Sequence, residues 1–342
     1  MKDTNRKATI YDVAKLSGFS PATVSLALGN SAKIKQSTKD IIRDAAEKLG
    51  YHPNYIARGL VKQRTRTICL VIPDNLNPVF SEITQGVEHY AYDRGYSIIL
   101  CTTNEDEKRE RFYLEIMRNN RADGLLIFPT FFHVVQEEAI KLKTSKIPFV
   151  IVGRKLGGIE SDFVAVNLES GGYKATDYLI KLGHTRIGMI YGVANPDLGK
   201  ERLEGYKRAF LENGIPFKQE LIKGCGYKIQ DGYKAAKEIL SNNNRPTAIF
   251  AINDLLAIGA LKAIKEKGLR VPEDISLIGF DNIEFASYTD PPLNTLSLRE
   301  KEMGKLAAEI LIERIEKGIS NKYKSILIEP ELIVRKSCSK KP

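Results

Sequence analysis

One stretch of sequence decides the fold of the N-terminal region: Thr9-Ile-Tyr-Asp-Val-Ala-Lys-Leu-Ser-Gly-Phe-Ser-Pro-Ala-Thr-Val-Ser-Leu-Ala-Leu28. Thr9 is followed three residues later by Asp12, a capping-box pattern in which each side chain pairs with the other residue's free backbone N–H. The pattern predicts a helix that begins near Ile10. Gly18 is expected to end this helix, because glycine readily takes the left-handed conformation found at helix ends.

Two further helices are predicted after Gly18. Ser20 as N-cap with Pro21 at the first helical position marks the start of the second helix, since proline lacks the N–H that would be unpaired there. Ser37, with Asp40 three residues later, is expected to cap a third helix that stops at Gly50. Two short helices joined by Gly-Phe-Ser and supported by a third predict a helix-turn-helix.

Charge separates this region from the rest of the chain. The 342 residues carry a formal net charge of +10. Residues 1–66 hold 13 Lys and Arg against 5 Asp and Glu, a net charge of +8, so the remainder is nearly neutral. A basic patch confined to one module is typical of nucleic-acid binding, because cations neutralise phosphates. The cations expected at phosphates are Lys33, Lys35, Lys39, Arg58, Lys62, Arg64 and Arg66.

These motifs resemble those of a known family. The pattern T-x-x-D-V-A-x-x-x-G-V-S-x-x-T-V-S is matched from Thr9 to Ser25, with Phe19 in place of the usual valine, and a second match runs from Leu49 to Leu60. The chain thus resembles the lactose/galactose repressor (LacI/GalR) family over nearly its whole length. The resemblance implies a DNA-binding headpiece joined to a core similar to periplasmic sugar-binding proteins.

The resemblance implies which headpiece side chains contact DNA. Pro21, Ala22 and Leu26 occupy the three positions that read bases in this family, and all three are apolar here. Readout by these side chains is therefore expected to be apolar, for example against thymine methyl groups, with further specificity from DNA shape. The other residues expected at the DNA are Tyr11, Ser20, Thr23 and Ser25.

Residues 53–60 resemble the family's hinge helix, which is thought to fold on the operator and to insert a leucine into the minor groove. Leu60 is that leucine by position. A segment this short that contains Gly59 is marginal as an isolated helix and needs a partner to order it. The alternative is a connector with one buried leucine.

From Thr67 onward, short apolar runs alternate with helical segments. Strand-like runs cover residues 68–72, 97–101, 124–128 and 149–152, and amphipathic stretches cover 80–94 and 109–120. The pattern restarts at residues 185–191, followed by strand-like runs at 248–251 and 276–279. Repeated β-α units predict an α/β core of parallel sheets with helices on both faces, and the restart predicts two similar lobes. Ligands are expected between the lobes, near the carboxyl ends of the strands.

The resemblance implies an effector pocket between the lobes. Arg202, Asn253 and Asp281 are carried over from the motifs R-x-x-G-Y, N-D and G-F-D, and they offer paired donors and acceptors for vicinal hydroxyls. Phe80 and Tyr227 stand where relatives place aromatic residues, which could stack on a sugar face. Taken singly, Asp281 could instead cap a turn and Phe80 could belong to the core.

One departure concerns the ligand. Gly153 stands where several sugar-binding relatives have aspartate, and Arg154 follows it. The change indicates a different or acidic ligand, unless Arg154 faces solvent.

No constellation for catalysis is visible. The glycine-containing stretches 192–201 and 224–226 lack the spacing of a phosphate-binding loop or a dinucleotide-binding turn. Four scattered histidines and four cysteines without a CxxC pair indicate no metal site, and no cofactor is expected. No run approaches the roughly 18 apolar residues of a spanning helix, so a cytoplasmic protein is expected.

The sequence as a whole predicts a homodimeric repressor that binds a palindromic double-stranded operator under control of a small effector, expected to be a sugar or sugar derivative. The expected parts are a headpiece (1–52), a hinge and linker (53–66) and a core (67–342). Lobe 1 is expected at about 67–165 and 293–322, and lobe 2 at about 166–292 and 323–338. A phosphoprotein corepressor in place of the sugar, and a transport-type sugar-binding protein, remain alternatives.

Overall fold

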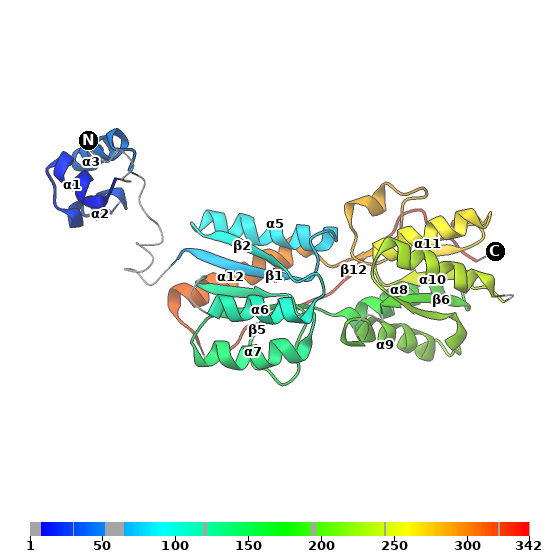
Figure 1. The fold of residues 1–342 in the computed structure, drawn as a ribbon. Helices are drawn as coiled ribbons and strands as arrows, with labels where there is room; N and C mark the ends of the chain where they lie inside the picture. The colour runs from blue at the N-terminus through cyan, green and yellow to red at the C-terminus, as the bar shows by residue number, and fades with distance from the viewer. Residues whose placement is uncertain are drawn as a thin grey trace. The chain divides into compact units, whose positions relative to one another are not determined.

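The structure is a computed structural model that describes residues 8–29, 31–51, 65–118, 122–192, 196–242, 244–320 and 322–341. The chain divides into two compact units, Met1–Thr65 and Arg66–Pro342. The first unit is helical, and the second alternates strands with helices (Figure 1).

The described residues of the first unit form three helices, α1 (Ile10–Ser17), α2 (Pro21–Leu28) and α3 (Gln36–Lys48). The Asp12 carboxylate accepts hydrogen bonds from the N–H of Thr9 (2.8 Å) and from its hydroxyl (2.7 Å). Gly18 ends α1 in the left-handed conformation, at φ 75°. The Ser20 hydroxyl accepts the N–H of Thr23 at the start of α2. The starts of α1 and α2 and the end of α1 are therefore as the sequence predicts.

The start of α3 differs from the prediction. The helix begins at Gln36, with Lys35 as N-cap and no side-chain cap, so Ser37 lies inside the helix. Asp40 instead accepts a hydrogen bond from the Gln36 side chain at 2.8 Å. The three helices bury a small core that includes the fully buried side chains of Val13, Val24 and Ile42.

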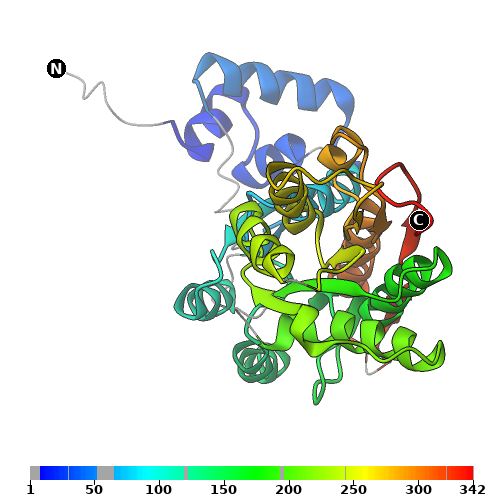
Figure 2. The same cartoon turned by 90° about the vertical axis from the view of Figure 1, so that its right-hand side faces the viewer.

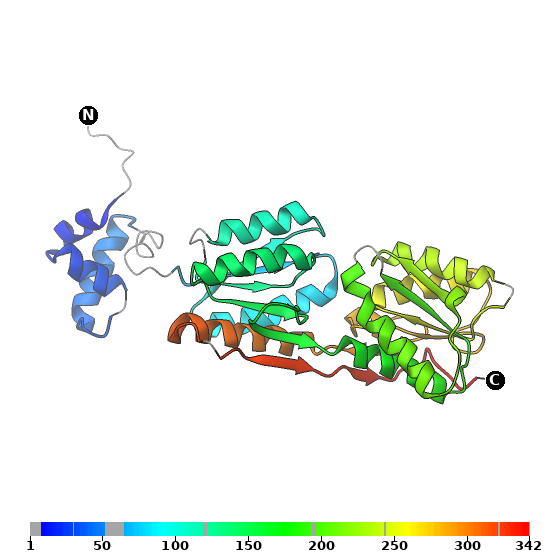
Figure 3. The ribbon, with the colours of Figure 1, turned by 90° about the horizontal axis from the view of Figure 1, so that it is seen from below.

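The second unit contains two lobes, each built on a parallel sheet. The sheet of lobe 1 has the order β11 (Ser325–Ile328), β5 (Asp162–Val166), β4 (Phe149–Gly153), β3 (Gly124–Ile127), β1 (Thr67–Ile72), β2 (Ser97–Thr102). All neighbouring strands of this sheet run parallel. Helices α5 (Pro78–Asp93) and α12 (Glu300–Lys317) cover one face, and α6 (Glu107–Arg118) and α7 (Phe132–Thr144) cover the other (Figure 3).

Lobe 2 repeats this plan with a four-stranded parallel sheet. Its order is β7 (Ile222–Cys225), β6 (Ile187–Gly192), β8 (Ala248–Ala251), β9 (Ser276–Ile278). Helices α8 (Leu168–Lys181) and α9 (Pro196–Glu212) pack together on one face, and α10 (Ile229–Ser241) and α11 (Asp254–Glu266) pack on the other (Figure 2). The predicted α/β fold with parallel sheets and two similar lobes is confirmed.

The chain crosses between the lobes three times in the described core. The crossings lie between β5 and α8, between β10 (Thr295–Ser297) and α12, and between β11 and β12 (Glu331–Ile333). Strands β10 and β12 pair antiparallel along two of these crossings. The sequence placed residues 323–338 in lobe 2, but β11 pairs with β5 in the sheet of lobe 1. The prediction was wrong for β11, because the lobe to which a short strand belongs depends on a partner far away in the sequence. Ser337 and Cys338, by contrast, do bond to Leu277 of lobe 2.

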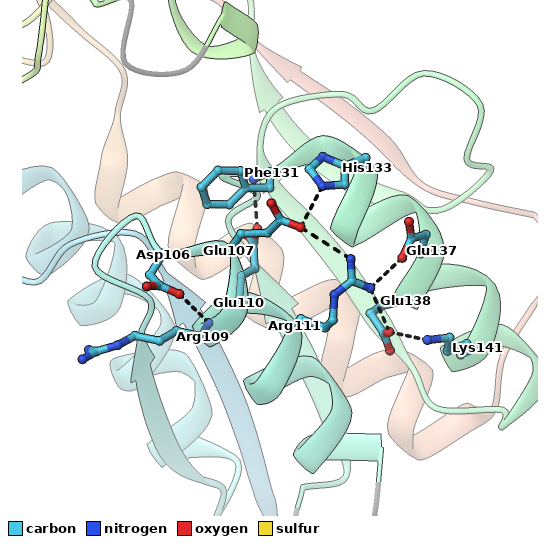
Figure 4. Close-up of polar contacts among 10 residues, drawn as sticks. All are labelled: Asp106, Glu107, Arg109, Glu110, Arg111, Phe131, His133, Glu137, Glu138 and Lys141. Atoms are coloured by element: carbon cyan, nitrogen blue, oxygen red, sulfur yellow. Dashed lines mark hydrogen bonds and ion pairs between the residues drawn. The ribbon is translucent and has the colours of Figure 1, made fainter.

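Charged side chains join α6 to α7 on the outer face of lobe 1 (Figure 4). The buried Glu110 carboxylate accepts the backbone N–H groups of Thr130 and Phe131, each at 2.9 Å, at the start of α7. Glu138 is also buried, and it lies 2.6 Å from Lys141 and 3.4 Å from Arg118. Glu110 thus acts as a cap for α7 that is supplied by another helix.

Glu110→Ala is expected to destabilise the protein by about 2–3 kcal/mol, because two backbone donors lose a charged acceptor inside the fold. Urea unfolding followed by circular dichroism measures the change. Glu137→Ala is the matched control, since Glu137 is an exposed member of the same network that pairs with Arg111. Equal urea midpoints for the two variants would show that the Glu110 cap contributes no more to stability than the exposed Glu137 does.

Candidate DNA-binding and effector sites

The headpiece residues predicted at DNA lie on the surface of the first unit. Tyr11 is 70% exposed and Leu26 is 45% exposed, which is unusual for large apolar side chains unless a partner covers them. Ala22 lies one turn before Leu26 on α2 and is exposed as well. The remaining predicted residues are exposed (Ser20) or partly exposed (Pro21, Thr23, Ser25).

Two of the cations expected at phosphates do not lie on the exposed surface of the first unit. Lys39 is buried, with 8% of its surface exposed. Arg66 lies at the start of the second unit, where it pairs with Glu316 at 3.5 Å and stacks over Tyr96. Lys33 and Lys35 are exposed, as a phosphate contact requires. Predictions for Arg58, Leu60, Lys62 and Arg64, and for the hinge helix 53–60, lie outside the described residues.

A cavity of about 190 Å³ lies between the two lobes of the second unit. All six residues predicted at the effector line it: Phe80, Arg154, Arg202, Tyr227, Asn253 and Asp281. Residues from both lobes contribute, so a molecule in this space would contact both.

The sheets explain why these side chains meet. Arg154 follows β4, Tyr227 follows β7, Asn253 follows β8 and Asp281 follows β9. Each therefore lies just beyond the carboxyl end of a parallel strand, the edge at which open α/β sheets bind ligands.

Asn253 and Asp281 are held rigidly. The Asn253 side chain accepts the N–H of Leu256 at 2.7 Å as the N-cap of α11, and it donates to the Tyr227 carbonyl at 3.2 Å. Asp281 has φ 105°, a conformation that residues other than glycine rarely adopt. Its N–H donates to the Leu296 carbonyl at 2.7 Å, which ties the strained residue to β10. Strain of this kind typically persists where the surrounding structure enforces a functional position.

Arg202 lies between an aromatic ring and a carboxylate. Its guanidinium lies 4.4 Å from the centre of the Phe280 ring and 3.7 Å from an Asp281 oxygen. Both residues are more than nine-tenths buried. Burial raises the pKa of Asp281 well above its usual range, although Arg202 opposes the shift.

Among the further cavity residues that sequence reasoning missed are Asp74, Glu105, Phe128 and Asp231. Phe128 ends a predicted strand and Asp74 lies two residues beyond another, and this position alone could have marked them. The Phe128 ring packs edge-on against Phe80, with 4.9 Å between ring centres.

Behind Asp281 lies another buried acid, Glu300, at the start of α12. Burial, with smaller contributions from Asp281 and Glu82, raises the pKa of Glu300 from 4.5 to about 8. Between these two values the folded protein holds a proton that the unfolded chain has released. The contribution of Glu300 to stability is therefore present at low pH and is lost as the pH rises through 8.

Glu300→Gln should remove this loss. Relative to the parent protein, the variant is expected to gain on the order of 1–3 kcal/mol in unfolding free energy between about pH 5 and pH 9. Urea unfolding across this pH range measures the difference. Glu309→Gln, at an exposed position of the same helix, should follow the parent curve. The same result for Glu300→Gln would contradict the prediction.

Within the described ranges, no three His, Cys, Asp or Glu side chains gather as a metal site would need. The helices in these ranges are all too short or too polar to cross a membrane.

In the comparison with known proteins, each of the two units matches a different family profile. Residues 9–54 match the profile of bacterial regulatory proteins of the lacI family, and residues 176–338 match that of the periplasmic binding protein-like domain. The HTH-type transcriptional repressor PurR of Aliivibrio fischeri is 38% identical over 336 residues, which cover 97% of this chain and 98% of the relative. The chain belongs to the lacI family of bacterial regulatory proteins.

As a member of the lacI family, the protein is a DNA-binding transcriptional repressor with a small-molecule effector. Two solved structures of regulators are similar over the fold. A complex of the transcriptional regulator CelR with cellobiose is 29% identical, with a TM-score of 0.73 over 96% of this chain and 99% of that one. A LacI family regulator from Enterococcus faecium with bound ribose is 30% identical, with a TM-score of 0.71 over 80% of this chain and 99% of that one.

Proposed function

We propose that the protein is a cytoplasmic, homodimeric repressor that binds a palindromic operator and takes a small carbohydrate as its effector. The cavity between the lobes carries this proposal, because all six side chains expected at the effector line it. The ligand class is supported by similar regulators whose structures contain cellobiose and ribose. The protein acts through binding and catalyses no reaction.

Control of DNA binding follows from the position of the cavity. A ligand that contacts both lobes binds most tightly to the lobe arrangement that surrounds it best, so it shifts the population toward that arrangement. Coupling is reciprocal, and the operator therefore changes effector affinity by the same factor.

A second copy of the chain is the expected partner of exposed apolar side chains on the core. Strand β2 is an edge of its sheet, and its Ile99 and Leu100 are 37% and 43% exposed. Tyr92 on α5 is 75% exposed. In lobe 2, Phe285 is 61% exposed and Tyr288 is 78% exposed. Open edges with apolar side chains pair readily with another chain. A two-fold dimer presents two headpieces, which predicts a palindromic operator.

Within the headpiece, α2 is proposed to enter the major groove. Its exposed Ala22 and Leu26 would contact base edges. The hydroxyl groups of Tyr11, Thr23 and Ser25 would contact the DNA backbone and so position the headpiece on the duplex. Leu60 is proposed to enter the minor groove.

Selection of bound sequences from a random duplex library tests the proposal. The selection is run at fixed salt without ligand and with a panel of sugars and sugar derivatives. The expected result is an enriched palindrome whose recovery one compound changes. Failure to enrich any sequence would contradict the DNA-binding role of this headpiece, and an enriched but non-palindromic site would contradict the dimer.

A further inference from the structure

The cavity carries an excess of buried positive charge. Of the charged residues that line it in the described structure, three are more than nine-tenths buried: Arg154, Arg202 and Asp281. Arginine keeps its charge at any pH that proteins meet, whereas a buried carboxyl can take up a proton instead. Asp281 is such a carboxyl, because burial raises its pKa well above the usual range. The deep end of the cavity is therefore cationic.

The two arginines face the same space from opposite lobes. Both line the main cavity, and both line an adjoining pocket of about 30 Å³, room for about one water molecule. Both also act on the Tyr227 hydroxyl: burial raises the pKa of this group, and the charges of Arg154 and Arg202 oppose the rise. One oxyanion placed here could contact both guanidinium groups.

Donors for such an oxyanion are available. Arg202 lies 3.7 Å from Asp281, beyond hydrogen-bonding distance, and its buried Nε has no hydrogen-bond partner among the described residues. The same holds for the buried hydroxyl of Tyr227. Buried donors without partners are costly unless a ligand or solvent satisfies them.

The wall of lobe 1 that carries Arg154 cannot supply a compensating carboxylate at residue 153. Gly153 has φ +84°, and a Cβ atom built there would lie 2.2 Å from the Phe128 ring. The aromatic ring thus fills the space that an aspartate would need. The departure noted in the sequence is enforced by packing against Phe128.

The mouth of the cavity has the opposite character. Asp74, Glu105 and Asp231 line it together with Lys228, and all four are more exposed than the arginines. Carboxylates at the mouth can accept hydrogen bonds from hydroxyl groups. The volume of about 190 Å³ equals about six water molecules, which suits one sugar ring between the aromatic walls of Phe80, Phe128 and Tyr227.

We infer that the effector is a single-ring sugar that carries a negative charge, a sugar acid or a sugar phosphate, with its oxyanion between Arg154 and Arg202 and its hydroxyl groups toward the acidic mouth. This inference rests on the proposed carbohydrate effector. Carboxylate and phosphate share the chemistry that paired guanidinium groups recognise.

Calorimetric titration of the full-length protein tests the inference. The probes are D-glucose, D-glucuronate and D-glucose 6-phosphate, with the matching galactose, mannose and ribose series. In at least one series, an acidic form should bind about tenfold or more tightly than its neutral parent, and added salt should narrow the gap. The acidic forms separate the two sources, since either the carboxylate or the phosphate binds better.

Variants locate the effect. Arg154→Gln and Arg202→Gln should each remove the preference for the acidic form, and Arg154→Lys should keep part of it. Lys200→Gln is the matched control and should retain the preference, because Lys200 is exposed on α9, two residues before Arg202, and does not line the cavity. Thermal unfolding of each variant checks that the core has folded.

Three results would overturn the inference: neutral parents that bind as tightly as their acids, a preference that survives in both Gln variants, or no binding by any acidic sugar. None of these results contradicts the proposed function by itself. That function is still supported if the duplex selection enriches a palindrome and a neutral sugar changes its recovery. A selection without a palindrome would instead contradict the proposed function, while the titration still reports on the cavity.

Discussion

Gly172→Ala should destabilise the core by about 2–4 kcal/mol and abolish effector binding. In an exposed helix the same change normally stabilises by about 1 kcal/mol, so the sign of the effect is diagnostic. Gly172 lies in α8 where α9 packs against it, and an added Cβ would lie 2.2 Å from the Arg202 carbonyl oxygen. Because the three nearest atoms, the carbonyl oxygen, carbonyl carbon and Cα of Arg202, all belong to the backbone, the helices must separate, and Arg202 moves with α9.

Urea unfolding and calorimetry measure the two consequences for Gly172→Ala. Gly157→Ala provides the matched control, since a Cβ at Gly157 meets no atom within 4 Å and its φ is unstrained. A Gly172→Ala protein as stable as the Gly157→Ala protein, with intact ligand binding, would refute the role assigned to this close packing.

Leu100→Asp should convert the dimer into monomers and reduce operator affinity about a hundredfold or more. Leu100 is 43% exposed on the edge strand β2, so the substitution leaves the fold of a single copy largely intact. In the proposed dimer, the carboxylate would be buried against its symmetry mate, and like charges in an apolar interface are strongly unfavourable. Loss of one headpiece per complex removes half of the DNA contacts.

Sedimentation and a binding titration with the selected palindrome check this second result. Leu327→Asp serves as the control, because Leu327 is 55% exposed on β11, the opposite edge of the same sheet. A Leu100→Asp protein that remains dimeric would remove β2 from the interface, and a monomeric protein with undiminished operator affinity would contradict the requirement for two headpieces.

Local signals in the sequence were sufficient for the helices of the headpiece. Thr9 and Asp12 lie three residues apart, and Ser20 precedes a proline, so each cap depends only on neighbouring residues. The start of α3 was misplaced because Gln36 competes for Asp40, a choice that the capping pattern does not reveal. The burial of Lys39 likewise depends on tertiary packing.

The cavity residues likewise divide into those that local motifs predicted and those that they did not. Motifs of the family led to Arg202, Asn253 and Asp281, since each motif is short and continuous. Phe128 has no such motif, although it occupies the space beside Gly153. The pairing of β11 with β5 joins residues more than a hundred positions apart, and periodicity alone says nothing about partners at this distance.

The three crossings between the lobes also determine when each part of the nascent protein can be finished. The headpiece emerges from the ribosome first, and its core involves no later residue among those described. Lobe 2 has its four strands and four helices once residue 278 is made, whereas lobe 1 still lacks α12 and β11. Lobe 2 also waits for the end of the chain, because Ser337 hydrogen-bonds to Leu277 and the N–H of Lys341 donates to the Leu182 carbonyl. Neither lobe is therefore complete until the last residues are made, and a chain that stops before residue 300 carries a DNA-binding module attached to an unfinished sensor.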